Sequence, residues 1–250
     1  MDLLSQLFLK STQFYVIVLI AVIGLVFIDR RIFMRALTVM LFSMVFNTFL
    51  KSIFKIPLKS HLKKDWYAFP SGHANTPATF YGYLVHRFKN ILVTLIGIFF
   101  ICGICWALVH NTYHDWADVL AAVGLSILLI ILFHWVDTSR LFKDNFMMLV
   151  LLITAVAYGL GKISPTITAH TAIPFGALLG LCATTILEKL FGYQGINQIV
   201  DFLIIMLGIV SFDVLFARFH LTGYNYQVLE FALISFWGTY SPHLLAKLRR

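Results

Sequence analysis

Nine long apolar segments, separated by short polar ones, constrain this chain more than any other feature of its sequence. Each has about 15 to 22 residues, close to the length that a helix needs to cross a bilayer. Only 12% of the residues are charged, against about a quarter in a soluble domain, so lipid must cover much of the surface. We therefore expect an all-α, polytopic membrane helical bundle. The segments lie near 13–29, 34–54, 72–87, 91–109, 117–136, 145–161, 171–189, 197–217 and 225–241.

No soluble domain, low-complexity tract or clear internal repeat interrupts these segments, which predicts a single membrane domain over residues 1–250. The three cysteines, Cys102, Cys105 and Cys182, all lie in apolar runs, which favours buried structural thiols over a redox or metal site. The chain has no nucleic-acid-binding motif and no soluble basic face, so its basic surplus does not indicate a nucleic-acid partner.

The distribution of Lys and Arg predicts the orientation, because cytoplasmic loops of membrane proteins carry an excess of both. Eleven of the 19 lie on the side of the C-terminus, and five of the other eight lie in one loop after the second segment. We expect the N-terminus outside, the C-terminus in the cytoplasm, and a first segment that is retained because its positive charges follow it. The exceptional loop indicates either an anionic ligand or an anchor for lipid headgroups. Its lysines are Lys51, Lys55, Lys59, Lys63 and Lys64.

The segment F-P-S-G-H follows this loop and begins the third apolar segment. Gly72 lets the backbone approach a ligand closely, and a helix that begins here directs N–H groups and its positive dipole end at an anion. Ser71 adds a hydroxyl, and His73 can donate a proton near neutral pH. These residues predict a phosphate site, with a helix cap beside an interfacial histidine as the alternative.

A second histidine motif, H-D-W-A-D, precedes the fifth segment on the same predicted side of the membrane. His114 and Asp118 are four residues apart, so they share one face of a helical turn. A carboxylate on one imidazole nitrogen sets the tautomer and leaves the other nitrogen free to attack phosphorus. The alternative is a zinc site with ligands among His110, His114, Asp115 and Asp118.

Together these motifs resemble those of the type 2 phosphatidic acid phosphatase (PAP2) superfamily, with the pattern K-x6-R-P, then P-S-G-H, then S-R-x5-H-x3-D. L-K-S-I-F-K-I-P-L-K matches the first motif at Lys51, and F-P-S-G-H matches the second throughout. H-D-W-A-D-V-L-A-A matches the third at His114 and Asp118. The resemblance covers about residues 34–136 and implies a PAP2-like core, with additional transmembrane helices at about 145–241.

The resemblance also implies an enzyme without metal or cofactor that acts on a phosphorylated membrane lipid at the non-cytoplasmic face. In such an enzyme His114 is the nucleophile, Asp118 orients it, and His73 protonates the leaving oxygen. The groups that bind and stabilise phosphate oxygens would come from Lys51, Ser71 and Gly72.

Two arginines of the family pattern are absent. The arginine of the first motif falls on Leu58 and its proline on Lys59, while the serine and arginine of the third fall on Ala107 and Leu108. A guanidinium fork on phosphate is hard to replace, but the groups implied to react all remain. We therefore expect a divergent lipid phosphate phosphatase with an altered phosphate cradle. A lipid phosphotransferase and a non-catalytic lipid binder or transporter are the alternatives.

Overall fold

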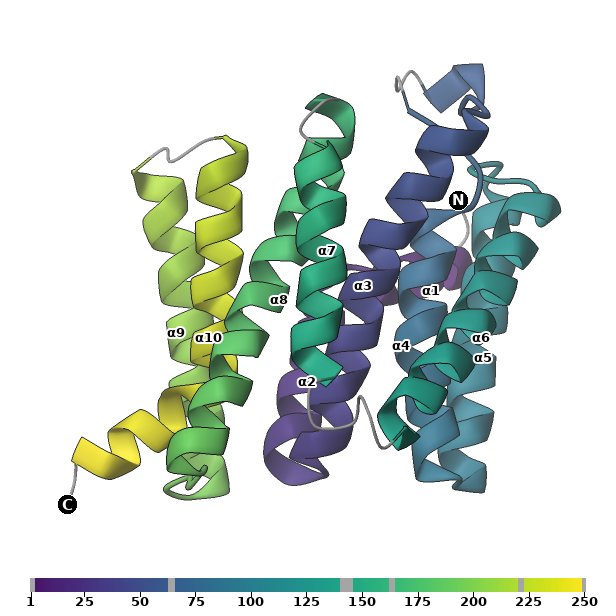
Figure 1. The fold of residues 1–250 in the computed structure, drawn as a ribbon. Coiled ribbons are helices and arrows are strands. Elements are labelled where there is room, and N and C mark those ends of the chain that lie inside the picture. Colours follow the sequence, from purple (N-terminus) through teal and green to yellow (C-terminus); the bar gives the residue numbers. More distant parts are fainter. Residues whose placement is uncertain (1–2, 63–65, 140–145, 162–164, 220–222, 249–250) are drawn as a thin grey trace. The chain divides into compact units, whose positions relative to one another are not determined.

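The protein is all-α in the computed structural model, which describes residues 3–62, 66–139, 146–161, 165–219 and 223–248. These residues form ten α-helices and no strand. Close contacts divide the helices, which are drawn in Figure 1, into two compact units. The first unit comprises Met1–Ile20 and Arg35–Asp144, and the second comprises Ala21–Met34 and Asn145–Arg250. The expectation of one membrane domain stays a prediction.

The first unit contains the whole region that resembles a PAP2 core, apart from its first residue. Within it α4 packs against α5 and α6, and α5 packs against α1. The helices α4 and α5 begin at residue types that favour an N-cap: Ser71 caps α4 and Asn90 caps α5. The helices with residues in this unit are α1 (Leu3–Ser11), the first half of α2 (Phe14–Phe27), most of α3 (Arg30–Phe54), α4 (Gly72–Phe88), α5 (Ile91–His110) and α6 (Trp116–Thr138).

The second unit is built around α10, which packs against both α8 and α9. α7 packs against α8 as well. Asn197 caps α9 by accepting a hydrogen bond from the N–H of Ile199. The helices that lie entirely in this unit are α7 (Phe146–Gly161), α8 (Pro165–Phe191), α9 (Gln198–Arg218) and α10 (Tyr224–Leu248).

Each of the nine predicted apolar segments coincides with a helix, from α2 to α10, which confirms the all-α, polytopic prediction. The predicted count of nine spans is not confirmed. Among the described residues five helices are long and apolar enough to span a membrane, or six if α1 and α2, bent by 58°, form one span. α4 and α7 have only 17 and 16 residues, short for a full crossing. The five are α3, α5, α6, α8 and α9.

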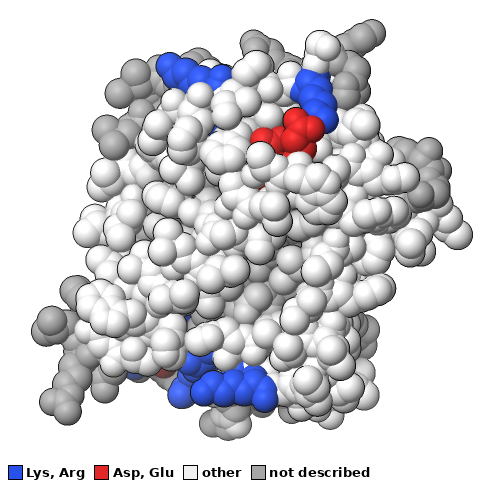
Figure 2. All heavy atoms as spheres, turned by 90° about the vertical axis from the view of Figure 1, so that its right-hand side faces the viewer, with Lys and Arg blue, Asp and Glu red and all other residues white. Residues whose placement is uncertain are grey.

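Charged side chains avoid the middle of the face seen in Figure 2, which is the side of Figure 1 where α5 and α6 lie. Lys, Arg, Asp and Glu gather at its two ends, and a broad band without them separates the ends. Large apolar side chains of both helices are exposed, among them Leu95, Phe99, Leu120 and Leu128. Water is a poor solvent for such a surface and lipid a good one, so the chain is an integral multi-pass membrane protein.

The helix α1 was not predicted from the sequence. It is too short to register as a span, and its polar residues interrupt the apolar pattern. Its place depends on Phe8, which is buried against α5, with ring centroids 5.3 Å from Phe99 and 6.5 Å from Trp106. Gly103 of α5 lies directly beneath the Phe8 ring, where a larger residue would not fit.

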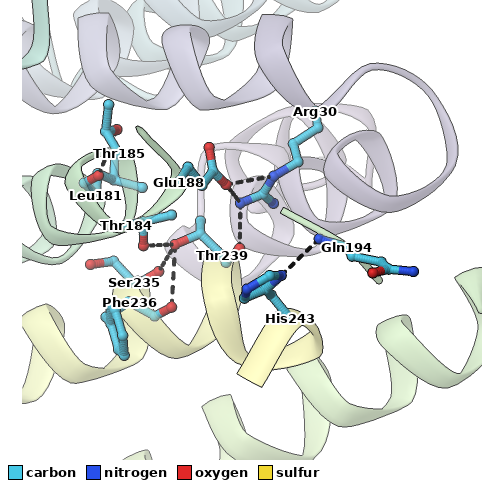
Figure 3. A network of polar contacts seen from close by, with 10 residues as sticks. All are labelled: Arg30, Leu181, Thr184, Thr185, Glu188, Gln194, Ser235, Phe236, Thr239 and His243. Carbon is cyan, nitrogen blue, oxygen red and sulfur yellow. Dashed lines mark hydrogen bonds and ion pairs between the residues drawn. The ribbon is translucent and has the colours of Figure 1, made fainter. Parts of the chain in front are cut away.

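Polar side chains of the second unit pair with one another inside it (Figure 3). Arg30 forms an ion pair with Glu188 and donates a hydrogen bond to the Thr239 carbonyl. The backbone N–H of Gln194 donates to His243 Nδ1 over 2.8 Å. These bonds tie the first residue of α3 to α8 and α10, and the loop after α8 to α10, so polar contacts here serve helix packing.

Candidate active site

All six residues predicted to act on phosphate lie in the first unit, near the end of α3 and the starts of α4 and α6. His114 precedes α6, and its Nδ1 is 3.1 Å from Asp118 Oδ2 in the first turn of that helix. Both residues are buried, with 5% and 7% of their surface exposed. The backbone N–H of Asp115 also donates to Asp118 Oδ2, over 3.2 Å, so local helix capping fixes the carboxylate.

The environment of His114 favours its neutral form. Burial lowers the pKa of His114 most, and the positive charges of Lys51 and Lys59 lower it further, while Asp118 raises it through the hydrogen bond and its charge. A carboxylate can only accept a hydrogen bond, so a neutral His114 carries its proton on Nδ1. Nε2 then keeps its lone pair, which is the state that a nitrogen nucleophile needs.

The start of α4 is bound directly to the start of α6. The backbone N–H of Ser71 donates to the backbone carbonyl of Asp118 over 3.1 Å. The Ser71 hydroxyl, which is fully buried, caps α4 by accepting from the N–H of Ala74 at 3.4 Å. The two histidine motifs, more than 40 residues apart in the chain, are therefore neighbours in the structure.

Gly72 and His73 occupy the first turn of α4. A Cβ on Gly72 would lie 3.6 Å from Asn47 Oδ1 and 3.9 Å from Lys51 Cε, at ordinary contact distance, so Gly72 packs against the end of α3. His73 is exposed. That His73 and His114 act on the same bound phosphate stays a prediction.

Lys51 is buried in the last turn of α3, and its ammonium group binds backbone. Nζ donates to the carbonyls of Tyr67 and Ala68 over 2.5 and 3.0 Å. An ammonium group has three N–H donors, and two of them are engaged here. Lys51 thus holds the chain that leads into F-P-S-G-H, a contact that the sequence did not indicate.

Backbone hydrogen bonds join the described loop residues 55–62 and 66–70. The Leu58 N–H donates to the Trp66 carbonyl, and the Ala68 N–H donates to the Ile56 carbonyl. Lys59 extends from this loop to the α6 start, where its Nζ is 2.7 Å from Asp115 Oδ1. Lys63 and Lys64, also predicted to attract an anion, lie outside the described residues.

The positions of the missing arginine and serine in the third motif are filled by buried apolar residues of α5. Ala107 is fully buried and Leu108 is 2% exposed. The Leu108 carbonyl accepts hydrogen bonds from the N–H groups of Tyr113 and His114, at 3.0 and 3.3 Å. This position therefore supports the His114 turn through its backbone, and its side chain offers phosphate no donor.

The proposed zinc ligands do not assemble. Among the described residues, no three His, Cys, Asp or Glu side chains are grouped so that they could hold a metal ion. The His110 ring is stacked on Trp106 instead, with centroids 4.8 Å apart.

Four buried polar residues beneath the site were missed by the sequence reasoning. Asn75 Nδ2 donates to the carbonyl and hydroxyl of Ser43 in α3, at 3.2 and 3.1 Å. Ser126 of α6 donates to Asn75 Oδ1 over 3.1 Å, and the Thr79 hydroxyl donates to Ser126 over 3.0 Å. The sequence signal that could have indicated this network is the presence of polar residues at similar depth in three apolar helices. The network joins α3, α4 and α6 one turn below Ser71.

Comparison with known proteins agrees with the motifs. Residues 32–142 match the family model of the PAP2 superfamily, close to the expected core. No curated protein and no solved structure matches the chain significantly.

Proposed function

This chain belongs to the PAP2 superfamily through residues 32–142, and we propose that it is a lipid phosphate phosphatase that forms a phosphohistidine intermediate. The substrate is a phosphorylated membrane lipid, a monoester or a diphosphate, because the site adjoins helices with lipid-exposed surfaces. The observation that carries the proposal is the buried His114–Asp118 pair, bound through Ser71 to the start of α4.

In the first step, His114 Nε2 attacks the phosphorus atom and the bond to the lipid oxygen breaks. His73 donates a proton to that leaving oxygen, which departs as the lipid alcohol or as a lipid monophosphate. In the second step, His73 accepts a proton from water as the water oxygen attacks phosphorus. The P–N bond breaks, phosphate leaves, and His114 is regenerated.

Charge develops on the phosphate oxygens as each bond forms, and cations and N–H groups stabilise it. The remaining N–H of the Lys51 ammonium and the Gly72 N–H at the start of α4 supply such donors. The Ser71 hydroxyl contributes in the same region, where it already caps α4. The distribution of Lys and Arg along the chain supports a site on the non-cytoplasmic side.

The test is a phosphate-release screen over lipid monophosphates and diphosphates with purified protein in detergent or liposomes. The proposal requires release from at least one lipid, inhibition by vanadate as a five-coordinate phosphorus mimic, and no loss in EDTA. Activity that EDTA removes and zinc restores would replace this mechanism with a metal-dependent one. Release of a phosphorylated acceptor alcohol instead of free phosphate would identify a phosphotransferase.

One observation favours a second candidate, a non-catalytic lipid binder or transporter. Ala107 and Leu108 are buried, so no guanidinium lies where the family pattern has one. This candidate predicts binding of lipid phosphates that persists in His114→Ala, with no phosphate release from any lipid by the unaltered protein.

A further inference from the structure

The ion pair between Lys59 and Asp115 joins two parts of the candidate site. Lys59 lies beside Leu58, the position where the family pattern has an arginine. Asp115 precedes α6 and donates its N–H to Asp118, the partner of His114. The Lys59 ammonium is thus connected to the histidine pair through one intervening residue.

We propose that this ion pair is a substrate-exchangeable latch: Lys59 leaves Asp115 to bind the phosphate held at His114. Lys59 thereby takes over the part of the phosphate cradle that the arginine missing at Leu58 would supply. The inference rests on the proposed function, because it concerns phosphate bound at the same site.

Exposure makes the exchange physically easy. The side chains of Lys59 and Asp115 are 32% and 72% exposed, and exposed ion pairs contribute little because water screens them. A phosphate dianion carries more charge and more acceptor oxygens than a carboxylate, so it is the stronger partner for an ammonium group. The long, flexible lysine stem permits the movement.

Lys51 cannot serve as this latch. It is buried, and two backbone carbonyls hold its ammonium group in place. Lys51 is a fixed donor, whereas Lys59 has a partner that a ligand can displace. The charge of Lys59 also acts on His114, as the smallest of the contributions that lower the pKa of that imidazole, after burial and Lys51.

The latch predicts opposite effects for its two members. Lys59→Gln removes a phosphate ligand, so KM should rise about ten- to hundredfold, as expected for the loss of a charged hydrogen bond. Asp115→Asn removes a competitor for Lys59, so KM should fall about two- to fivefold. Asn is also a good N-cap, so this change preserves the start of α6.

The experiment measures KM, kcat and vanadate inhibition for Lys59→Gln, Asp115→Asn and the double variant, with Lys55→Gln as matched control. Lys55 is an exposed lysine of the same loop, so it reports general attraction of an anion. The double variant should match Lys59→Gln, because Asp115 competes for nothing once Lys59 is gone. Lys59→Arg should keep KM near the unaltered value.

Two results would overturn the latch: a rise in KM for Asp115→Asn similar to that for Lys59→Gln, or an equal rise for Lys55→Gln. The first would make the pair a structural brace, and the second would make the effect one of net charge. If the unaltered protein releases no phosphate, the proposed function fails. The affinity of the same variants for vanadate, measured by calorimetry, then tests the latch independently: it should fall in Lys59→Gln and the double variant, and rise in Asp115→Asn.

Discussion

The second unit and the candidate site of the first unit use polar side chains in different ways. In the second unit Arg30 is paired with Glu188 and with a Thr239 carbonyl, so side chains satisfy one another between helices. In the candidate site the corresponding cation, Lys51, is held by loop carbonyls, and His114 binds Asp118 through Nδ1, which leaves Nε2 for the proposed attack on phosphorus. Polar residues in apolar helices therefore do not indicate function by themselves.

The difference lies in where the polar groups sit. Those of the candidate site lie at helix ends, where the first backbone N–H groups have no partner within the helix and can bind an anion. Those of the second unit join neighbouring helices side by side, as Thr184 and Thr239 do with a 2.7 Å hydrogen bond. We expect changes in the candidate site to affect turnover and changes in the second unit to affect stability.

The largest expected effect is the loss of turnover when His114 is replaced. His114→Ala should lower phosphate release by about 10⁴-fold or more, because the nucleophile is lost. The thermal unfolding midpoint should fall only modestly, because Asp118 loses the imidazole but keeps its hydrogen bond from the Asp115 N–H. Initial rates beside a melting curve in the same detergent give the answer. Residual turnover above one tenth would contradict the assignment of the nucleophile.

The next effect concerns His73 as proton donor. His73→Ala should lower kcat about 10²- to 10⁴-fold with a lipid substrate, whose alcohol is a poor leaving group. An aryl phosphate such as p-nitrophenyl phosphate needs little protonation, so its loss should be much smaller. An equal loss with both substrates would show that His73 does not act as the acid.

A smaller effect is expected in the second unit. Glu188→Gln leaves Arg30 without a charged partner in a half-buried setting, which should cost about 1–3 kcal/mol of folding stability. The unfolding midpoint should fall, while kcat per folded molecule stays unchanged. Thr184→Val, which removes only the bond to Thr239, is the matched control and should cost about 1 kcal/mol. A loss of kcat without destabilisation would contradict the view that polar contacts of the second unit serve stability.

The smallest effect is on pH dependence. Burial and the charges of Lys51 and Lys59 lower the pKa of His114, against the opposing effect of Asp118, so the imidazole protonates only below its ordinary range near pH 6.5. Activity should therefore persist through pH 6.5 and decline at lower pH. Lys59→Gln removes a charge that lowers the pKa of His114, so the acidic limb of kcat/KM should move to higher pH. Lys55→Gln should leave it in place, and a downward shift in Lys59→Gln would contradict this account.

Much of the fold followed from the sequence because its signal is local. A lipid-facing helix must satisfy its own backbone and present apolar side chains, so each run of apolar residues from α2 to α10 marked a helix. The same reasoning did not establish the number of spans, because apolar length alone does not show that a helix such as α4 or α7 crosses the bilayer. His114 and Asp118 could be paired for a similar reason, since four residues along a helical turn bring side chains together.

The sequence by itself determined the helical, membrane-embedded class of this protein, the H-x-x-x-D pair and the polar cap at the start of α4. Only the tertiary structure decided that Ser71 binds the Asp118 carbonyl and that Lys51 donates hydrogen bonds to the loop before α4. It also decided that Asn75 bridges α3 and α6. Local periodicity carries no information about such partners. They are chosen when helices pack, because a buried donor or acceptor must find its partner wherever the fold brings one within reach.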